Sequence, residues 1–194
     1  MPDTLTTAHE LDPIDAREYQ ALCSISRTVD ILGPRWNFQI MREALAGITR
    51  FADFREMLGV SPDVLSARLS SLVDAGVLER RKYHAPGERA RDEYVLTQAG
   101  RELDVVISAL RDWGDRHAPG EFGPISRRVR RSDGTPVRVA YVDESGHEVP
   151  SEDVVALPVD STPAVRFYAR RGELVARAAS VREPGAVQQP VENS

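Results

Sequence analysis

The sequence predicts an α+β fold, in which a helical domain with a two-stranded hairpin is followed by a small β-rich module. Three features carry this prediction. Two amphipathic helical segments meet at a very short turn near Gly59, a basic β-type hairpin follows at residues 77–97, and short β-type runs with turn signals begin after residue 118. We therefore expect an N-terminal arm (1–22), the helical domain (23–118), a β-rich appendage (119–180) and a disordered tail (181–194).

Glycine and proline separate the first helices of the domain. Residues 23–32 place Ile25, Val29 and Leu32 on one side of a short helix. Gly33 is expected to be the N-cap of the next helix, with Pro34 at its first helical position. A further helix is expected from the sequence "ITRFADFREML", and Gly59 ends it.

The join after Gly59 predicts a helix-turn-helix. Only Val60 separates this glycine from Ser61, an N-cap residue, and Pro62 is suited to the first helical position. Val60 and Leu65 have the spacing of a hydrophobic staple. The expected buried stripe of the second helix is Leu65, Leu69, Leu72 and Val73. Two helices joined by so short a turn are typical of DNA-binding domains, in which the second helix enters the major groove.

The hairpin that follows is expected to be a wing. Its strands are "VLERRKYHA" and "RDEYVLT", with a turn at "APGE". The whole chain has a net charge of -5, but residues 78–91 hold five basic side chains against two acidic ones. Attraction to phosphate acts over about a Debye length, so this local patch matters more than the total charge. The alternative is a charged hairpin that is merely solvated.

These patterns define a candidate DNA interface. On the helical wheel of the second helix the outward residues are poor in groups that read bases, so the wing is expected to supply more of the affinity through phosphates or a narrow minor groove. The candidate contacts are Ser61, Asp63, Ser66, Ala67, Arg68 and Ser70 on the helix, and Arg80, Lys82, Arg89 and Arg91 on the wing.

A long final helix is expected after Thr97, which is its predicted cap. Its apolar face holds Leu103, Val106, Ile107, Leu110 and Trp113. This face is expected to join two copies of the chain, and the alternative is that it packs against the chain's own core.

Composition limits the class of protein. The first twenty residues lack the apolar run of a signal peptide, and no window approaches the ~18 apolar residues of a membrane span, so we expect a cytoplasmic protein. The single cysteine, Cys23, excludes a disulfide within the chain. No His-Asp-Ser set, glycine-rich phosphate loop or HExxH motif is present, so we expect neither an enzyme nor a cofactor.

Taken together, residues 23–117 resemble the HxlR-type winged helix-turn-helix transcriptional regulators. The matching positions are Cys23, Gly33, Arg35-Trp36, Arg50-Phe51, Phe54, Ser61-Pro62, Leu65-Ser66, Arg68-Leu69, Ala75-Gly76, Tyr83, Glu93-Tyr94, Leu96-Thr97, Gly100 and Trp113-Gly114. The resemblance implies a homodimer, joined through N-terminal and C-terminal helices, that binds a pseudo-palindromic operator, more often as a repressor. The family often has a basic residue at Asp63, a polar one at Ala67 and a charged one at Ser70, so operator preference is expected to differ.

Two further expectations come with the resemblance. Some relatives use a cysteine at the position of Cys23 to sense oxidants or electrophiles, and a thiolate near a helix start, with Arg27 one turn on, would react readily; the alternative is an inert packing thiol. Some relatives carry a zinc-ribbon tail with Cys-Gly knuckles. Here Gly134 and Gly146 remain, but the ligand positions are Arg130, Asp133, Val142 and Ser145, so we expect a ribbon-like β module without metal.

Two other roles stay open at this point. The chain could be a winged-helix module for protein contact, with the C-terminal β region as the partner-binding part. A small-molecule effector could also bind where Trp36, Phe38, Tyr83 and Trp113 gather between the dimer helices and the core, although aromatic residues at helical spacing are more often core.

Overall fold

The computed structural model describes residues 15–83, 91–157, 159 and 162–182. Its contacts divide the chain into two compact units. We call Thr28–Val154 the helix-turn-helix unit, and the described parts of Met1–Arg27 with Val155–Ser194 the terminal unit. The two units are considered separately below.

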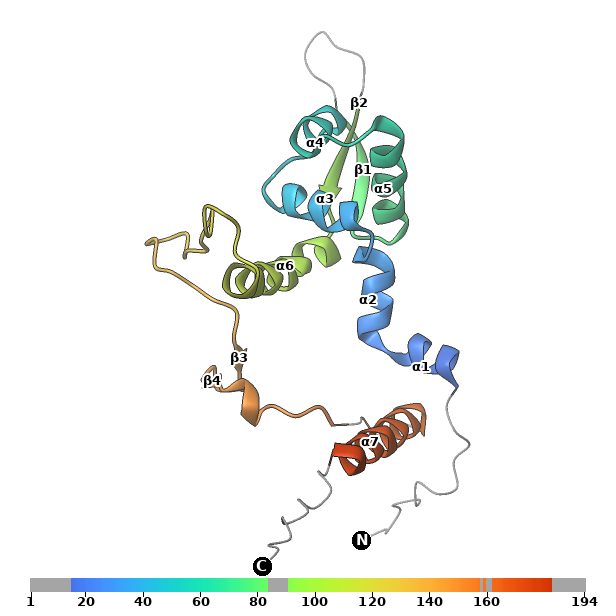
Figure 1. Cartoon of the computed structure of the whole chain (residues 1–194). Coiled ribbons are helices and arrows are strands. Elements are labelled where there is room, and N and C mark those ends of the chain that lie inside the picture. Colours follow the sequence, from blue (N-terminus) through green and yellow to red (C-terminus); the bar gives the residue numbers. More distant parts are fainter. Residues whose placement is uncertain (1–14, 84–90, 158, 160–161, 183–194) are drawn as a thin grey trace, which may run out of the picture. The chain divides into compact units, whose positions relative to one another are not determined.

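The main part of the helix-turn-helix unit consists of the end of one helix, three further helices, a hairpin and one long helix (Figure 1). In chain order they are the end of α2 (Ser24–Leu32), α3 (Arg35–Leu45), α4 (Phe51–Leu58), α5 (Pro62–Asp74), β1 (Leu78–Tyr83), β2 (Arg91–Leu96) and α6 (Gln98–His117). The side chains that are almost wholly excluded from solvent are Leu32, Ile40, Met41, Phe54, Leu65, Leu69, Leu72 and Leu78. The predicted α+β winged helix-turn-helix fold is thus confirmed, with a core at the meeting of α3, α4, α5 and the hairpin.

The turn between α4 and α5 follows the prediction closely. Gly59 ends α4 with φ of 61°, in the left-handed region that glycine adopts without strain. Ser61 occupies the N-cap position of α5 with Pro62 at its start, but the Ser61 hydroxyl makes no capping hydrogen bond. Its carbonyl oxygen accepts from the Leu65 backbone nitrogen at 3.0 Å. Val60 and Leu65 are both buried, as a hydrophobic staple requires.

One helix start differs from the prediction. Helix α3 begins at Arg35, and Pro34 stands at its N-cap with φ of -58° and ψ of 124°. The expected arrangement, with Gly33 as N-cap and Pro34 inside the helix, is therefore wrong by one residue. The ψ of Pro34 is extended rather than helical, so the first helical turn can begin only after it.

The hairpin is antiparallel, in register from Leu78 opposite Leu96 to Tyr83 opposite Arg91. A third segment joins its edge, because Arg50 forms an antiparallel bridge with Glu93 and the Tyr94 backbone nitrogen donates to the Thr49 carbonyl at 2.7 Å. The predicted turn "APGE", and Arg89 with it, lies outside the described residues.

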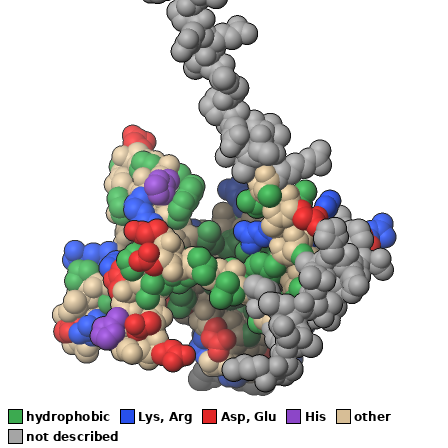
Figure 2. Space-filling view, turned by 90° about the horizontal axis from the view of Figure 1, so that it is seen from below, with side chains coloured by type: hydrophobic (Ala, Val, Ile, Leu, Met, Phe, Trp, Pro, Cys, Tyr) green, Lys and Arg blue, Asp and Glu red, His purple; other side chains and the backbone are tan. Residues whose placement is uncertain are grey.

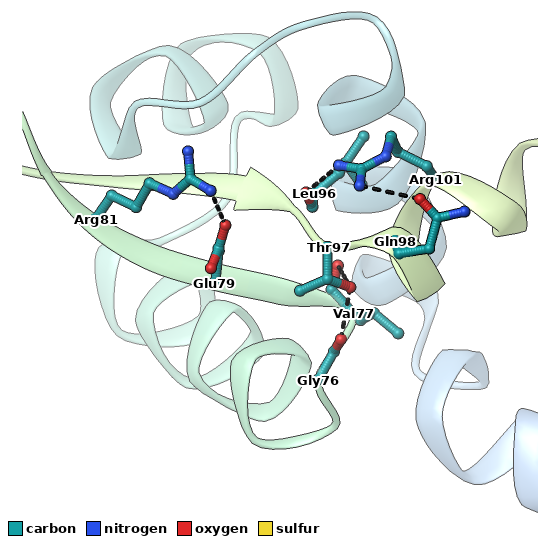
Figure 3. Close-up of polar contacts among 8 residues, drawn as sticks. All are labelled: Gly76, Val77, Glu79, Arg81, Leu96, Thr97, Gln98 and Arg101. Atoms are coloured by element: carbon teal, nitrogen blue, oxygen red, sulfur yellow. Dashed lines mark hydrogen bonds and ion pairs between the residues drawn. The ribbon is translucent and has the colours of Figure 1, made fainter.

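Hydrogen bonds around Thr97 fix the base of the hairpin (Figure 3). The Thr97 hydroxyl donates to the Gly76 carbonyl at 2.7 Å and accepts from the Gly100 backbone nitrogen at 3.1 Å, so the predicted cap of α6 is confirmed. Arg101 on α6 donates to the Leu96 carbonyl at 2.7 Å. The end of α5, the hairpin and α6 are thereby held together at one point.

Much of the predicted apolar face of α6 is open to solvent in the single chain. Leu103 and Ile107 pack against the core, whereas Val106, Leu110 and Trp113 are 41%, 50% and 58% exposed. The alternative, in which the whole face packs on its own core, is therefore wrong for the outer half of the stripe.

Residues 119–154 contain little regular structure. Val129 bridges Pro136 around a turn in which Gly134 has φ of 73°. A second, smaller hairpin pairs β3 (Tyr141–Val142) with β4 (Glu148–Val149), and a short 3-10 helix, η2 (Ser151–Asp153), follows. Large hydrophobic side chains are exposed here, including Phe122 and Ile125 at 87% and 93%. Hydrophobic side chains are also exposed on the face of the molecule seen from below (Figure 2).

The terminal unit overturns part of the prediction for the C-terminal region. Residues 162–182 form a helix, α7 (Thr162–Arg182), so the expected β-rich appendage over 119–180 is wrong for its last part. Gly172 lies inside this helix, and Arg170 pairs with Glu173 about one helical turn on, at 3.0 Å. Alanine and arginine are the commonest residues of the segment, and both favour helix over strand. Helix α7 packs against α1 (Ala16–Leu22), where Arg166 pairs with Glu18 at 2.8 Å.

Candidate nucleic-acid interface

The outward face of α5 is small and weakly polar. Asp63, Ser66 and Ala67 are exposed, as is Ser61 at the start of the helix. Arg68 and Ser70 are half-buried, so Ser70 is less accessible than the helical wheel predicted. Serine hydroxyls can donate to or accept from several bases, and an alanine methyl group can contact a thymine methyl. This helix therefore offers contacts of low selectivity.

The inner face of the wing carries two cations joined by one carboxylate. Arg80 and Lys82 lie on the same face of the hairpin as Asp92, because Lys82 stands directly opposite Asp92 in the register. The Lys82 Nζ lies 2.7 Å from one Asp92 carboxylate oxygen, and the Arg80 Nη1 lies 3.9 Å from the other. The hydrogen bond from Lys82, followed by the charges of Lys82 and Arg80, lowers the pKa of Asp92 below its ordinary value. The Asp92 carboxylate therefore pairs with Arg80 and Lys82, the two cations predicted to bind DNA.

The outer face of the wing is also partly neutralised. Arg81 pairs with Glu79 on the same strand, and the two side chains meet beside the Thr97 anchor (Figure 3). Both side chains are well exposed. Exposed pairs of this kind contribute little to stability, so the arginine is readily released to another anion.

A cavity of about 600 Å³ lies between the wing and α5. Its polar lining comes from Ser66 on α5, from Arg80, Arg91 and Asp92 on the wing, and from Arg50 before α4. Three guanidinium groups against a single carboxylate make the lining basic. Phosphate oxygens are the partners that such planar, multi-donor groups bind best. The cavity therefore connects the predicted recognition helix to the predicted wing through one basic surface.

Arg50 is the interface residue that the sequence analysis missed. Its guanidinium lies 4.4 Å from the centroid of the Tyr83 ring, and its Nη2 donates to the Tyr83 hydroxyl at 2.7 Å. Stacking on an aromatic face holds the arginine in one orientation with part of its donor set still directed outward. Arg80 lies in a similar way over the Tyr94 ring, at 5.8 Å. In the sequence Arg50 stands in the "TRF" stretch before α4 and is one of the positions that match the HxlR-type regulators.

Cys23 belongs to the terminal unit. It is a half-buried free thiol at the start of α2. Hydrogen bonds from the backbone and then the side chain of Ser26 lower the pKa of the thiol, and the charge of Arg27 adds a smaller effect in the same direction. The expected influence of Arg27 is present, but the hydrogen bonds from Ser26 exceed it.

The four aromatic residues of the expected effector pocket have different surroundings. Trp36 and Phe38 pack against the core, Tyr83 lies beneath Arg50, and Trp113 lies on α6 with its ring centroid 5.1 Å from that of His117. Of the four, Tyr83 alone lines the cavity between the wing and α5. The expectation of a shared aromatic pocket is therefore not supported by these contacts.

Metal ligands and membrane spans were also sought. Within the described ranges, no group of three or more histidine, cysteine, aspartate or glutamate side chains is placed to hold a metal ion. Asp133, the one possible metal donor among the four expected ligand positions, instead accepts from the Thr135 backbone nitrogen at 3.0 Å and pairs with Arg130. Among the described helices, none combines the length and apolar character needed to cross a bilayer.

Comparisons with known proteins agree with this geometry. Residues 31–122 match the family described as HxlR-like helix-turn-helix. The uncharacterised HTH-type transcriptional regulator Rv3095 of Mycobacterium tuberculosis is 32% identical over 154 residues, covering 76% of this chain and 89% of that regulator. The uncharacterised regulator YdeP of Bacillus subtilis is 31% identical over 96 residues, covering 49% of this chain and 73% of its own.

Two solved structures are similar over more than the helix-turn-helix region. PA1607, described as a candidate transcription factor, superposes with a TM-score of 0.63 at 32% identity and covers 73% of this chain and 98% of its own. PA1374 of Pseudomonas aeruginosa, described in the same way, gives a TM-score of 0.54 at 36% identity and covers 74% of this chain and 99% of its own.

Proposed function

The chain belongs to the HxlR-like helix-turn-helix family of DNA-binding transcriptional regulators, and we propose that it acts as a homodimeric repressor on a pseudo-palindromic operator. The observation that carries the proposal is the basic cavity between the wing and α5, where Arg50, Arg80 and Arg91 face the recognition helix. A cationic surface beside a helix-turn-helix suits the phosphate backbone that flanks a major groove.

Each part of the interface has its own task in this proposal. Helix α5 enters the major groove, and Ser66 and Ala67 contact base edges weakly. Arg50 and the wing cations Arg80 and Lys82 bind phosphates or a narrow minor groove. Most of the affinity then comes from charge, so binding falls steeply as salt concentration rises.

The exposed half of the α6 face supports the dimer. Leu110 and Trp113 are about half exposed in the single chain, and large apolar side chains along one helix are typical of a surface that a second copy covers. Two copies related by a twofold axis present two recognition helices, and operator half-sites mirror that symmetry.

Binding to DNA from beside the protein's own gene, measured by gel shift over a range of salt concentrations, tests the proposal. Loss of one phosphate contact in Arg50→Gln is expected to flatten the salt dependence by about 0.9 in log-log slope. Arg170→Gln is the matched control, because Arg170 lies on α7 and pairs with Glu173. Equal binding by both variants at every salt concentration would contradict the role of Arg50.

The alternative role in protein contact has one observation in its favour. Phe122 and Ile125 are 87% and 93% exposed in the segment after α6, where a partner could cover them. The turns at Gly134 and Gly146 support the interpretation of this region as a ribbon-like module without metal. Absence of binding at low salt to DNA from beside the protein's own gene would favour this alternative.

Cys23 is a candidate redox sensor within the same proposal. Its lowered pKa raises the thiolate fraction, which is the form that oxidants attack. Mild peroxide followed by mass spectrometry and gel shift is expected to show an oxidised Cys23 and altered DNA binding. An unmodified thiol with unchanged binding would leave Cys23 as an inert packing residue.

A further inference from the structure

The terminal unit contains a groove that the proposed DNA interface does not use. Its volume is about 770 Å³, within the range of small-molecule sites in proteins. One wall comes from the junction of α1 and α2, with Cys23 and Ile25. The other comes from Leu157, Val159 and the first turns of α7. Segments from the two ends of the chain therefore build it together.

The walls of this groove are apolar and uncovered. Ile25 and Leu157 are both 75% exposed, and Val159 is 70% exposed, although all three line the hollow. Phe167 and Tyr168 are half-buried beside them, with ring centroids 5.3 Å apart. Uncovered apolar side chains around a concavity of this size mark a surface that gains free energy when an apolar body covers it.

The polar lining of the groove is cationic, with Arg27 on α2 and Arg171 on α7. Arg27 is held in place, since its Nη1 donates to the Ala21 and Leu22 carbonyls at 2.7 and 2.9 Å. Its Nη2 also donates to the Ser24 hydroxyl at 3.0 Å. A guanidinium has five N–H donors, so these bonds fix its position without using its whole donor set.

The acidic side chains described in the terminal unit are engaged elsewhere. Asp15 accepts from the backbone nitrogens of the first turn of α1, at 2.7 and 2.8 Å. Glu18 pairs with Arg166, and Glu173 pairs with Arg170. Among the described residues, none of these three carboxylates lines the groove, so its positive charge lacks a carboxylate partner there.

We propose that this groove binds a small amphipathic anion, namely a carboxylate or sulfonate on an aromatic or branched apolar body. The anionic head contacts Arg171, with Arg27 contributing from the opposite wall, and the body covers Leu157, Ile25 and the Phe167 ring. This proposal does not depend on the proposed DNA binding, because every residue that carries it lies in the terminal unit.

A matched pair of fluorescent probes tests the proposal on the full-length protein. 1-Anilinonaphthalene-8-sulfonate carries the anionic group, and N-phenyl-1-naphthylamine is the same body without it. The sulfonate is expected to bind the wild type more tightly than the neutral probe. Arg171→Gln should weaken sulfonate binding about tenfold, as expected for one charge-assisted contact, and leave the neutral probe unchanged. Phe167→Ala should weaken both probes.

The control variant is Arg170→Gln, which removes the same charge one residue away from a side chain paired with Glu173. It is expected to bind both probes as the wild type does. Equal loss of the sulfonate in Arg170→Gln and Arg171→Gln would overturn the proposal, because it would reveal a general charge effect. The amount of sulfonate probe bound per chain should not depend on protein concentration. A decrease at higher protein concentration would also overturn the proposal, because a second copy would then cover the groove.

Discussion

Replacing Asp92 by asparagine is expected to strengthen DNA binding. In the free protein this carboxylate holds both cations of the inner wing face, Lys82 at 2.7 Å and Arg80 at 3.9 Å. A DNA phosphate that binds the same cations must displace Asp92 and lie near its negative charge. Asparagine keeps the size of the side chain and removes the charge, so both cations become available without that competition.

The size of the effect follows from the exposure of the pair. The side chain of Lys82 is 68% exposed and that of Asp92 is 30% exposed, so water screens their attraction. Exposed pairs of this kind are weak, and removing the competitor should therefore raise DNA affinity by about fivefold at most. One further phosphate contact would steepen the log-log salt slope by about 0.9.

Fluorescence anisotropy with a labelled duplex, measured at several salt concentrations, gives both quantities. Asp74→Asn is the matched control, because it also removes one negative charge, but from the last residue of α5 rather than from the wing. The pKa of Asp92 is lowered, so the wild-type carboxylate stays charged below the ordinary aspartate range. The difference between Asp92→Asn and the wild type should persist at neutral pH and close only as the pH falls through the lowered pKa of Asp92, where the wild-type carboxyl becomes protonated as well. Unchanged or weaker binding by Asp92→Asn at neutral pH would refute the reasoning.

Three other expectations concern the arginines predicted for the wing, the base of the wing and the dimer. Arg89→Ala combined with Arg91→Ala should weaken binding to all DNA sequences alike and flatten the salt slope by about 1.8, and an unchanged slope would count against the wing. Gly100→Ala should lower the free energy of unfolding in urea by about 1–3 kcal/mol, because a Cβ there would stand 2.1 Å from a backbone carbonyl oxygen at the start of the wing. Gly114→Ala on the same helix meets nothing within 4 Å and should stabilise by about 0.5–1 kcal/mol. Leu110→Glu should shift the protein from dimer to monomer in sedimentation velocity, and a persisting dimer would place the interface elsewhere.

The helix-turn-helix was predictable because its signals are local. Gly59 and Pro62 fix the end of one helix and the start of the next, and the stripe of Leu65 and Leu69 identifies the buried face. Thr97 likewise predicts the start of α6, because its hydroxyl accepts a capping hydrogen bond from the backbone nitrogen of Gly100, three residues later. Each of these signals depends on neighbours in the chain, so one sequence suffices to read it.

Some features of the fold and of the candidate site could not be predicted, because they depend on contacts between residues far apart in the sequence. Arg50 reaches Tyr83, 33 positions away, because a single bridge to Glu93 brings it to the edge of the hairpin. A single bridged residue such as Arg50 produces no repeating hydrophobic pattern in the sequence, so pattern analysis does not detect it. Helix α7 was missed for a different reason, because short apolar runs around Phe167, interrupted by Gly172, fit strand and helix alike. Its contact with α1, through Arg166, is made across most of the chain.

The wing explains how a chain of net charge -5 can serve as a DNA binder. In the free protein Glu79 neutralises Arg81, and Asp92 neutralises Lys82 and Arg80, so the inner and outer faces each carry their own counter-charge. Exposed pairs of this kind are weak, and phosphates can replace the carboxylates at little cost. The same carboxylates oppose binding to any polyanion that does not present phosphates at the right spacing. The paired carboxylates should therefore lower the affinity for non-specific DNA more than the affinity for the operator. Replacing Asp92 by asparagine should accordingly reduce the ratio of operator affinity to non-specific affinity.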